Sequence, residues 1–588
     1  MSASERDGEG RGEGPAARYR SAEWFEGDDE VAVLNRVALR VGPHDRGRPV
    51  IGIADTSSGL NPCNAAFELV LPELERGVRE AGGIPVRFPA MSLGEDLMKP
   101  SAMLYRNLLA IELEENARAH PLDGLVLLAN CDKTVPAALM AAASVELPSL
   151  LLLGGARSAP RLDGRPLGSG TDLWRLLEQR RAGLVDAEKW GEVERVLSCA
   201  GPGSCNTMGT ASTMALMAEA LGMALPGSTG CPSADGELAR LAHATGVQVV
   251  RQVQQDQLPQ HRLTQPALDN AFRLLAAVGG STNAVVHLAA VAGRLGLDCS
   301  LERVDRLWSD VPLLVDVEPC GTRLIQDFHQ AGGLLSLAAA MIPAGLLHGG
   351  VATASGAPLA DIAAAAPAPS GVIRTVAEPL RPGPTLAAVF GTLAPSGAVI
   401  KTAAASPDLL QHSGRAVVFD DYKEMRVRLD DEDLAVDPED VLVVRGCGPV
   451  GVPGMPEWGM APIPRRLVAA GVRDMVRVTD GRMSGTSFGT VVLHVAPEAA
   501  VGGALALVRD GDRITLDLER RRLDLEVDEP ELDRRRQQTD PPARQHLRGW
   551  PRHYQEHVLQ APQGCDLDYL TGPTPESRRF VHPVVGRS

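Results

Sequence analysis

Three cysteines lie in similar settings and could supply sulfur ligands. Cys63 lies in NPCN, Cys131 in NCDK and Cys205 in GPGSCNTMG. The first two follow apolar runs typical of strands, and the third precedes a helical stretch that begins TAST. Because a helix N-terminus favours thiolate, we expect such a thiol to ionise readily. Converging thiolates could hold an iron–sulfur cluster with one open iron, or a zinc ion, but the spacing matches no ferredoxin or zinc-finger pattern, and each cysteine could instead be a small buried hydrophobe.

Oxygen donors form a second group of candidate ligands. Glu95 lies in SLGED, Asp132 in CDK and Glu457 in PGMPEWG, all in Gly- or Pro-rich stretches predicted as loops after strands. Hard oxygen donors suit Mg²⁺, which keeps positions open for water or substrate. Lys133 cannot be a ligand while it is protonated, but carbamylation by CO₂ would convert it into an oxygen ligand. A carboxylate taken singly is more often a helix cap or a solvent contact in a loop.

A serine between glycines is a candidate for proton transfer. Ser484 lies in VTDGRMSGTSFGT, residues 478–490, in a setting typical of a nucleophile elbow. No Asp-then-His order follows it, so the serine would act as a base only if a metal lowered its hydroxyl pKa. His494 in VVLHVAP is predicted to lie in the middle of a strand as a hydrogen-bonded core histidine.

The elements that must position these residues alternate in the first part of the chain. Apolar runs at 48–55, 83–90, 123–130 and 148–155 each lead into a polar or Gly-rich loop, with helix-like segments between them. Strands that alternate with helices predict a parallel α/β sheet. Since ligands gather beyond the carboxyl ends of such strands, the four loops should open on one edge.

The pattern of apolar and polar residues changes in the rest of the chain. Helical stretches at 210–227 and 267–296 predict a helical middle, and an Ala-, Pro- and Gly-rich stretch at 354–385 ends in a predicted domain boundary. Short alternating runs follow, including RITLDLERRRLDLEVDE, which predicts a hairpin. We therefore expect a flexible tail at 1–18, an α/β domain at 19–385 with a helical middle, and a mostly β, barrel-like domain at 390–588.

Composition excludes several classes of function. The 588 residues are 44% hydrophobic and 22% charged, which is ordinary for a globular protein. A net charge of −16 argues against a nucleic-acid partner. No apolar run approaches the ~18 residues of a membrane span, and the polar N-terminus lacks the apolar core of a signal peptide, so we expect a cytoplasmic protein. Nine scattered cysteines favour free thiols or metal ligands over disulfides.

Seven sequence blocks occur in an order that is specific to one family. The chain resembles the dihydroxy-acid and sugar-acid dehydratases, which also include phosphogluconate dehydratase, over residues 19–570. The blocks that carry the resemblance are PCN, CDKTVPA, CNTMGTASTMALMAEALGMALPG, GGSTNAVVHL, SGAVIKTAA, PGMPEWG and TDGRMSGTSFG. The resemblance implies a hydro-lyase that works as a homodimer or homotetramer on a small sugar acid.

The resemblance also implies a role for each candidate residue. It implies a [2Fe–2S] cluster on Cys63, Cys131 and Cys205, and Mg²⁺ surrounded by Glu95, Asp132, carbamylated Lys133 and Glu457. Ser484 matches the family's proposed base, and Thr486 matches a nearby substrate contact. The other cysteines match no ligand position and are expected to be structural: Cys199, Cys231, Cys299, Cys320, Cys447 and Cys565.

Two stretches favour the pentonate and hexonate branch, which includes L-arabinonate and D-xylonate dehydratases. These stretches are GEDLMKPSAMLYRNL and CNTMGTASTM. The expected reaction is dehydration of a 2,3-dihydroxy sugar acid to a 2-keto-3-deoxy acid. The alternatives are a branched-chain dihydroxy-acid dehydratase and a non-catalytic iron–sulfur redox or sensor protein. One departure bears on the substrate, because Ser57-Ser58-Gly59 stands where the family often has Trp-Ser-acidic.

Overall fold

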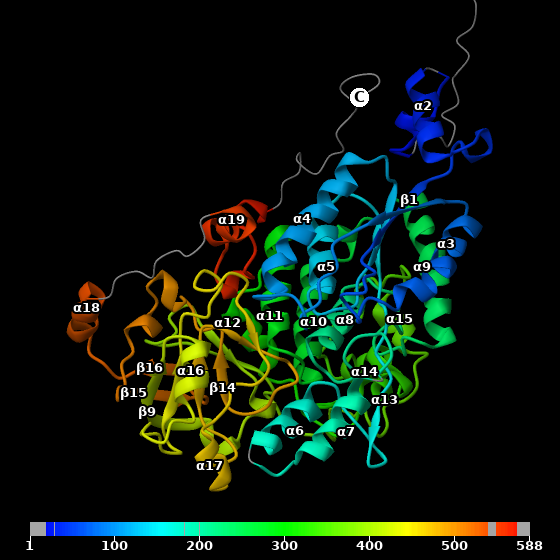
Figure 1. Ribbon diagram of the computed structural model, residues 1–588. Helices are drawn as coiled ribbons and strands as arrows, with labels where there is room; N and C mark the ends of the chain where they lie inside the picture. Colours follow the sequence, from blue (N-terminus) through cyan, green and yellow to red (C-terminus); the bar gives the residue numbers. More distant parts are fainter. Residues whose placement is uncertain (1–18, 29, 182, 199, 539–547, 573–588) are drawn as a thin grey trace, which may run out of the picture.

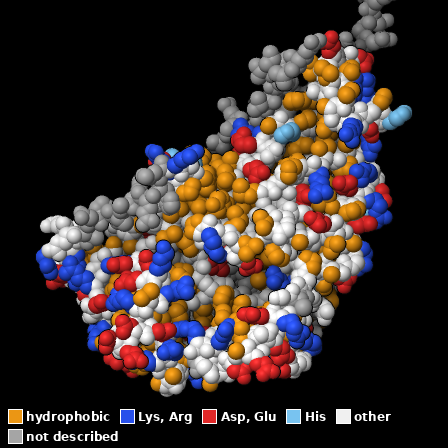
Figure 2. All heavy atoms as spheres, viewed as in Figure 1, with side chains coloured by type: hydrophobic (Ala, Val, Ile, Leu, Met, Phe, Trp, Pro, Cys, Tyr) orange, Lys and Arg blue, Asp and Glu red, His pale blue; other side chains and the backbone are white. Residues whose placement is uncertain are grey.

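The computed structural model describes residues 19–28, 30–181, 183–198, 200–538 and 548–572. The predicted tail at 1–18 and Cys199 lie outside the described residues. Among the helices in the described ranges, none combines the length and apolar character needed to cross a membrane. Figure 2 shows acidic and basic side chains interspersed over the lower part of one face, with hydrophobic side chains gathered across its upper centre.

The first sheet is parallel, as the alternating pattern predicts. Its four strands are hydrogen-bonded in the order β2-β1-β3-β4. Strands β1, β3 and β4 are buried throughout, because helices cover both faces of a parallel sheet. The strands are β1 (Val50–Asp55), β2 (Ile84–Pro89), β3 (Gly124–Leu128) and β4 (Ser149–Leu152).

Alternate residues of β1 divide the sheet's two faces between two hydrophobic cores. Ile51 and Ile53 pack in one core with side chains of α3 (Phe67–Glu80) and α9 (Gly236–Gln254). Val50 and Ala54 pack in the other, with α4 (Met103–Ala119) and α5 (Thr134–Ser144). Figure 1 shows the two helix pairs on either side of β1. The period of two along a strand thus decides which helices cover which face.

The predicted helical middle is confirmed. Helix α8 is buried along its whole length, since it packs against α5, α10 and α11. The helices of the middle region are α6 (Thr171–Arg181), α7 (Ala187–Ser198), α8 (Thr210–Ala220), α10 (Gln265–Ala277), α11 (Asn283–Leu295), α12 (Leu301–Trp308), α13 (Ile325–Gln330), α14 (Gly333–Met341) and α15 (Leu359–Ala363). Two short N-terminal helices precede the sheet, α1 (Ala22–Phe25) and α2 (Glu30–Leu39).

The second sheet is a nearly closed barrel, which confirms the fold class predicted for the C-terminal region. Its eight strands follow the order β16-β15-β9-β10-β12-β14-β8-β7, and an isolated bridge between Phe390 and Arg522 brings the two edges together. The predicted hairpin is β15 with β16. The strands are β7 (Ala387–Val389), β8 (Ala398–Ile400), β9 (Gln411–Phe419), β10 (Val441–Val444), β12 (Arg477–Thr479), β14 (Val491–Leu493), β15 (Arg513–Asp517) and β16 (Arg522–Leu525).

Smaller elements join the barrel to the first half. Strand β11 (Glu457–Trp458) pairs in parallel with β13 (Arg482–Met483) as a separate two-stranded sheet. The remaining helices are α16 (Tyr422–Arg428), α17 (Arg465–Ala469), α18 (Glu529–Gln538) and α19 (Gly549–His557). After α19 the chain returns to α4 and α11: buried Arg106 donates to the Gly564 carbonyl at 2.7 Å, and Arg294 pairs with Asp566 at 2.8 Å. The domain boundary near 385 stays a prediction.

The close crossing of α3 and α9 generates a stability prediction. A Cβ on Gly77 would lie 2.1 Å from the backbone oxygen of His243, and a Cβ on Gly246 would lie 2.3 Å from that of Leu74. Gly77→Ala must therefore push the helices apart, and we expect a loss of about 1–3 kcal/mol in the free energy of unfolding. Differential scanning calorimetry should show a lower Tm.

Gly191→Ala is the matched control. Gly191 also lies inside a helix, α7, but a Cβ there meets no atom within 4 Å. Alanine has the better helix propensity by about 0.8–1.0 kcal/mol, so this variant should keep or raise the Tm. Equal Tm values for Gly77→Ala and the unaltered protein would contradict the tight crossing.

Candidate active site

The loops at the carboxyl ends of all four parallel strands contribute to one cavity of about 480 Å³. Residues from the barrel half line the same cavity, so it lies between the two parts of the chain. Of the residues singled out in the sequence, the cavity is lined by Cys63, Glu95, Cys131, Asp132, Cys205, Glu457, Ser484 and Thr486. Lys133 has no exposed surface and lies behind this lining.

Three carboxylates gather at one side of the cavity. Glu95, Asp132 and Glu457 each offer an oxygen within 4.8 Å of the others. Buried Lys133 lies among them, with its Nζ 2.7 Å from Asp132, 3.3 Å from Glu95 and 3.4 Å from Glu457. Glu457 begins the short strand β11, so the prediction that it lies in a loop after a strand was wrong.

A second buried cation balances this acidic group. Arg482 pairs with Glu457 and lies 3.8 Å from Glu95, and its Nε donates to the carbonyl of Met455 at 2.7 Å. Asn283 also donates to Glu457, at 3.0 Å. Register explains the position of Arg482, because β13 places it directly beside Glu457 of β11. With three carboxylates and two cations, the group carries a net charge of −1 when all are ionised.

The pKa values reflect this balance of burial and charge. Burial alone would lower the pKa of Lys133, but Asp132 and Glu95 raise it above its ordinary value. Burial raises the pKa of Asp132 to about 6, although Lys133 opposes the shift. Burial likewise acts to raise the pKa of Glu95, yet Lys133 and Arg482 bring it below its usual value. An unmodified Lys133 is thus a positively charged ammonium among carboxylates, where it supplies positive charge as a metal cation would.

The donor set fits a hard divalent cation. All three acidic side chains present oxygen, the donor that Mg²⁺ prefers. The buried Oε2 of Glu95 accepts no well-directed hydrogen bond from the described residues, although Lys133 lies near it, so it keeps a lone pair for a ligand. Glu95 and Asp132 also line the cavity and can reach a bound molecule as well as a metal.

Sulfur donors occupy the neighbouring part of the cavity. Cys63 follows β1, Cys131 follows β3, and Cys205 lies five residues before α8; every described cysteine is free. Arg157, in the loop after β4, directs its Nη2 toward the Cys63 sulfur at 3.8 Å. Among the described residues, no fourth cysteine lines the cavity. Three thiols suit a metal group that needs three thiolates, and the charge of Arg157 favours the ionised form of Cys63 and Cys205.

Ionisation differs between the thiols, and the expectation for Cys205 was wrong. A hydrogen bond from Cys131 and the charge of Arg157 lower the pKa of Cys63, despite burial. The same hydrogen bond, together with burial, raises the pKa of Cys131. Burial raises the pKa of Cys205 to about 12, against the opposing effect of Arg157. Loss of hydration outweighs proximity to a helix N-terminus, because Cys205 lies outside the first turn of α8.

The third group is a short chain of hydrogen bonds that ends at Ser484. The Ser484 Oγ lies 2.9 Å from the Thr486 Oγ1, and the backbone N–H of Thr486 donates to the same Oγ at 3.4 Å. Trp174 Nε1 donates to the Thr486 Oγ1 at 2.9 Å. Because the Thr486 oxygen accepts from Trp174, its own proton is available to Ser484. The serine oxygen therefore accepts from the Thr486 N–H and can also accept from the Thr486 hydroxyl.

His494 differs from its prediction in two respects. It follows β14 in place of lying within it, and its φ of 60° marks the end of the strand. Its buried Nε2 has no hydrogen-bond partner among the described residues, so it is not the hydrogen-bonded core histidine that the sequence predicts. Burial and the charge of Arg482 lower its pKa to about 3, which makes His494 a neutral group behind the acidic cluster.

Sequence reasoning missed Arg157, Trp174, Asn283 and Arg482. Two of these had a usable signal. Arg157 lies two residues after the predicted strand at 148–155, in a loop at the ligand-binding edge, and Arg482 lies two residues before Ser484 in the same motif block. Asn283 lies in the block GGSTNAVVHL, but nothing there pointed to Glu457. Trp174 carries no such signal, since its role depends on a contact across 312 residues of sequence.

Comparison with known proteins shows which family the chain resembles along most of its length. The N-terminal domain of the dihydroxy-acid/6-phosphogluconate dehydratases matches residues 48–362, and their C-terminal domain matches residues 371–565. An L-arabonate dehydratase of Azospirillum brasilense is 45% identical over 94% of this chain and 97% of its own length. A 6-deoxy-6-sulfo-D-gluconate dehydratase of Pseudomonas putida is 44% identical over 94% and 96%. A dihydroxy-acid dehydratase of Ignicoccus hospitalis is 36% identical over 89% and 95%. The resemblance drawn from the sequence is confirmed, and the chain belongs to the dihydroxy-acid/6-phosphogluconate dehydratase family.

Proposed function

We propose that the protein is a hydro-lyase that dehydrates a 2,3-dihydroxy sugar acid to a 2-keto-3-deoxy acid. The observation that carries the proposal is that oxygen donors, sulfur donors and Ser484 line a single cavity. Relatives named for sugar acids are 44% and 45% identical to this chain, compared with 36% for a dihydroxy-acid dehydratase. A purely structural role would leave unexplained why oxygen donors, sulfur donors and Ser484 line the same cavity.

Each donor set would hold a metal group suited to one end of the reaction. Glu95, Asp132, Glu457 and a carbamylated Lys133 would hold Mg²⁺, and Cys63, Cys131 and Cys205 would hold a [2Fe–2S] cluster. When bound, Mg²⁺ supplies charge that acidifies the proton next to a carboxylate, and a cluster with an open iron supplies a Lewis acid for a departing hydroxyl. Carbamylation requires CO₂ to reach a neutral Lys133 amine.

Ser484 would act as the base that takes the proton from C2. Its alkoxide would be stabilised by the Thr486 hydroxyl at 2.9 Å and by the Thr486 N–H, with Trp174 fixing the direction of the Thr486 proton. Donors fixed in advance around a developing negative charge cost no reorganisation during the reaction. As the C2–H bond breaks, the C3–O bond breaks too, and the departing hydroxide takes up the proton that Ser484 gained, which releases water and restores the alkoxide. The enol then tautomerises to the ketone as its 2-hydroxyl proton is lost and a proton is added at C3.

The lining of the cavity favours a polyhydroxy substrate over a branched-chain acid. Outside the two donor sets and the serine chain, polar side chains of Asp96, Lys99, Ser169 and Thr210 face the cavity, together with Arg157. Asp96 and Lys99 are exposed, and Ser169 and Thr210 already hydrogen-bond to Asn206 and Ser281. The hydroxyls of a sugar acid can form further hydrogen bonds with this lining that a branched alkyl group cannot form. A redox or sensor protein would need neither the carboxylates nor Ser484. A homodimer or homotetramer in the cytoplasm stays part of the proposal.

Substitution of Ser484 by alanine tests the base. Ser484→Ala should lower kcat by about 10²–10⁴-fold, because the C2 proton loses its acceptor. The visible absorption of the cluster should be unchanged, since Ser484 donates no ligand to it. Ser309→Ala is the control, because Ser309 is exposed and bonds only within its own turn. Normal turnover in Ser484→Ala would remove the serine from the mechanism.

Trp174 is a positioning residue, and its test is a pH profile. In Trp174→Phe the Thr486 hydroxyl loses its fixed direction, so the Ser484 alkoxide is less stabilised and the pKa of the serine rises. The acidic limb of the kcat–pH profile should move to higher pH, with a loss of about 10-fold in kcat at neutral pH and little change in KM. Thr486→Ser should keep the original limb, whereas Thr486→Val should shift it. A change in KM with no change in kcat or in its pH profile would contradict this role.

A substrate panel tests the reaction itself. Iron-loaded protein assayed without oxygen and with Mg²⁺ should form 2-keto acids from one or more aldonic acids. The kcat/KM for the best aldonate should exceed that for 2,3-dihydroxyisovalerate by at least about 100-fold, because an alkyl group cannot satisfy the polar lining. A preference for dihydroxyisovalerate would overturn the sugar-acid assignment and favour the branched-chain alternative.

A further inference from the structure

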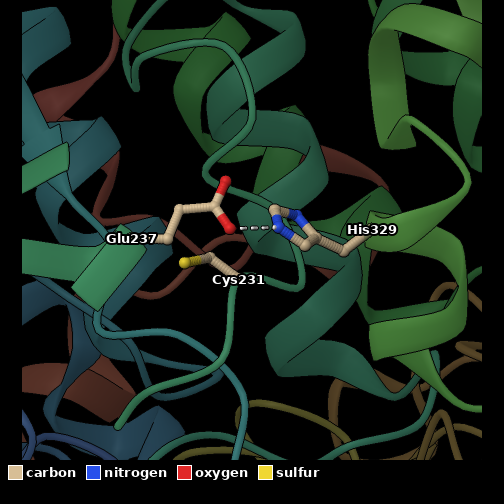
Figure 3. A group of neighbouring side chains, drawn as sticks. All are labelled: Cys231, Glu237 and His329. Atoms are coloured by element: carbon tan, nitrogen blue, oxygen red, sulfur yellow. Dashed lines mark hydrogen bonds and ion pairs between the residues drawn. The ribbon is translucent and has the colours of Figure 1, made fainter. Parts of the chain in front are cut away.

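A second group of metal-ligand side chains lies apart from the proposed active site. Cys231, Glu237 and His329 each offer a ligand atom within 4.8 Å of the others, and none of them lines the catalytic cavity. Cys231 lies between α8 and α9, Glu237 in the first turn of α9, and His329 in α13. Figure 3 shows the Glu237 carboxylate and the His329 ring directed at each other, with the Cys231 sulfur beside the Glu237 side chain.

The hydrogen bonds of His329 leave one nitrogen in need of a cation or a proton. Its Nδ1 lies 3.2 Å from the carbonyl oxygen of Thr229, and its Nε2 lies 3.2 Å from a carboxylate oxygen of Glu237. Both of these oxygens are acceptors, and a neutral imidazole has only one N–H to donate. If Nδ1–H bonds to the carbonyl, the Nε2 lone pair faces a carboxylate. A metal ion between the two would satisfy both.

The residues around the His329 ring hold it as metal-binding histidines are commonly held. Metal-ligating histidines commonly donate their second N–H to a backbone carbonyl, which fixes the tautomer and the ring orientation. Thr229 supplies that carbonyl and is itself anchored, because its N–H and hydroxyl donate to buried Glu219 at 2.9 Å and 2.6 Å. Gly230 allows the close approach, since a Cβ there would lie 3.1 Å from the Cβ of His329.

The donor types select the class of metal. A thiol, an imidazole and one carboxylate form a mixed set that suits Zn²⁺, in contrast to the all-oxygen set of the catalytic cavity. The side chain of Glu237 is 42% exposed and that of His329 is 10% exposed, while Cys231 is buried, so an ion can enter from solvent. Three protein ligands leave a fourth tetrahedral position for water.

We propose that Cys231, Glu237 and His329 form a Zn²⁺ site that fastens the segment before α9 to α13. This segment lies behind the proposed sulfur site: the Ala156 N–H donates to the Cys231 carbonyl at 2.8 Å, and the next residue, Arg157, donates to the carbonyl of Ser204 at 2.9 Å. The ion therefore supports the backbone that holds Arg157 and Cys205. It takes no part in the dehydration, and the proposal stands independently of the proposed function.

Zinc content of the whole holoprotein tests the site. The protein, loaded with Zn²⁺ and dialysed in excess Mg²⁺ to keep the acidic cluster occupied, should retain about one more zinc per chain than Glu237→Gln or His329→Gln. Zinc affinity in these variants should fall by more than about 100-fold, beyond the effect of losing an outer partner. Glu188→Gln is the matched control, since Glu188 is an exposed first-turn glutamate of α7.

Cobalt substitution tests the sulfur ligand separately. Co²⁺ added to the holoprotein should produce a thiolate-to-cobalt charge-transfer absorption that is absent in Cys231→Ser and present in Cys299→Ser. Saturating Zn²⁺ should raise the Tm by roughly 2–5 °C in the unaltered protein and not in Glu237→Gln, which is expected to fold because its side chain is partly exposed. Equal zinc content and equal Tm shifts in both proteins, or a charge-transfer band that survives in Cys231→Ser, would overturn the proposal.

Discussion

The mutual repulsion of three closely spaced carboxylates is the constraint on which the arrangement of the two halves depends. Glu95 and Asp132 come from the parallel sheet, and Glu457 comes from the barrel half. Two fully buried cations, Lys133 from one half and Arg482 from the other, lie among them. Removing one partner of a buried ion pair costs about 3–5 kcal/mol, because the remaining charge loses its compensation. The halves are therefore joined by charge neutralisation at the site itself.

One short strand pair in the barrel half and the loops of the parallel sheet bring their residues to this site. The pairing of β11 with β13 places Arg482 beside Glu457, and Ser484 follows immediately, with its N–H bonded to the carbonyl of Trp458 at 2.7 Å. On the other side, the parallel sheet gathers four loops at the carboxyl ends of its strands. Backbone hydrogen bonds thus fix the chain positions of Glu457, Arg482 and the proposed base relative to one another.

Local pattern was sufficient for most of the fold. The apolar runs at 48–55, 83–90, 123–130 and 148–155 became the strands of one parallel sheet, and the alternation after 513 became a hairpin. The runs that form β1, β3 and β4 are buried throughout, whereas β2 lies at the edge of the sheet and is partly exposed. Local sequence pattern was insufficient to predict properties that depend on burial, such as pKa values and hydrogen-bond partners. The pKa of Cys205 depends on its loss of hydration, and the unpaired nitrogen of His494 depends on what surrounds it in three dimensions. Neither quantity is encoded in neighbouring residues.

The turn that follows β3 shows why the two donor types belong together. Cys131 and Asp132 are consecutive, so their Cα atoms are held about 3.8 Å apart by covalent geometry. Both side chains face the cavity, with the Cys131 sulfur 3.5 Å from the Asp132 carboxylate, while Lys133 turns into the protein. A sulfur site and an oxygen site that share one turn cannot drift apart as the protein fluctuates. A fixed, short separation suits a substrate whose reacting oxygens are on adjacent carbons, as in the 2,3-dihydroxy acids proposed here.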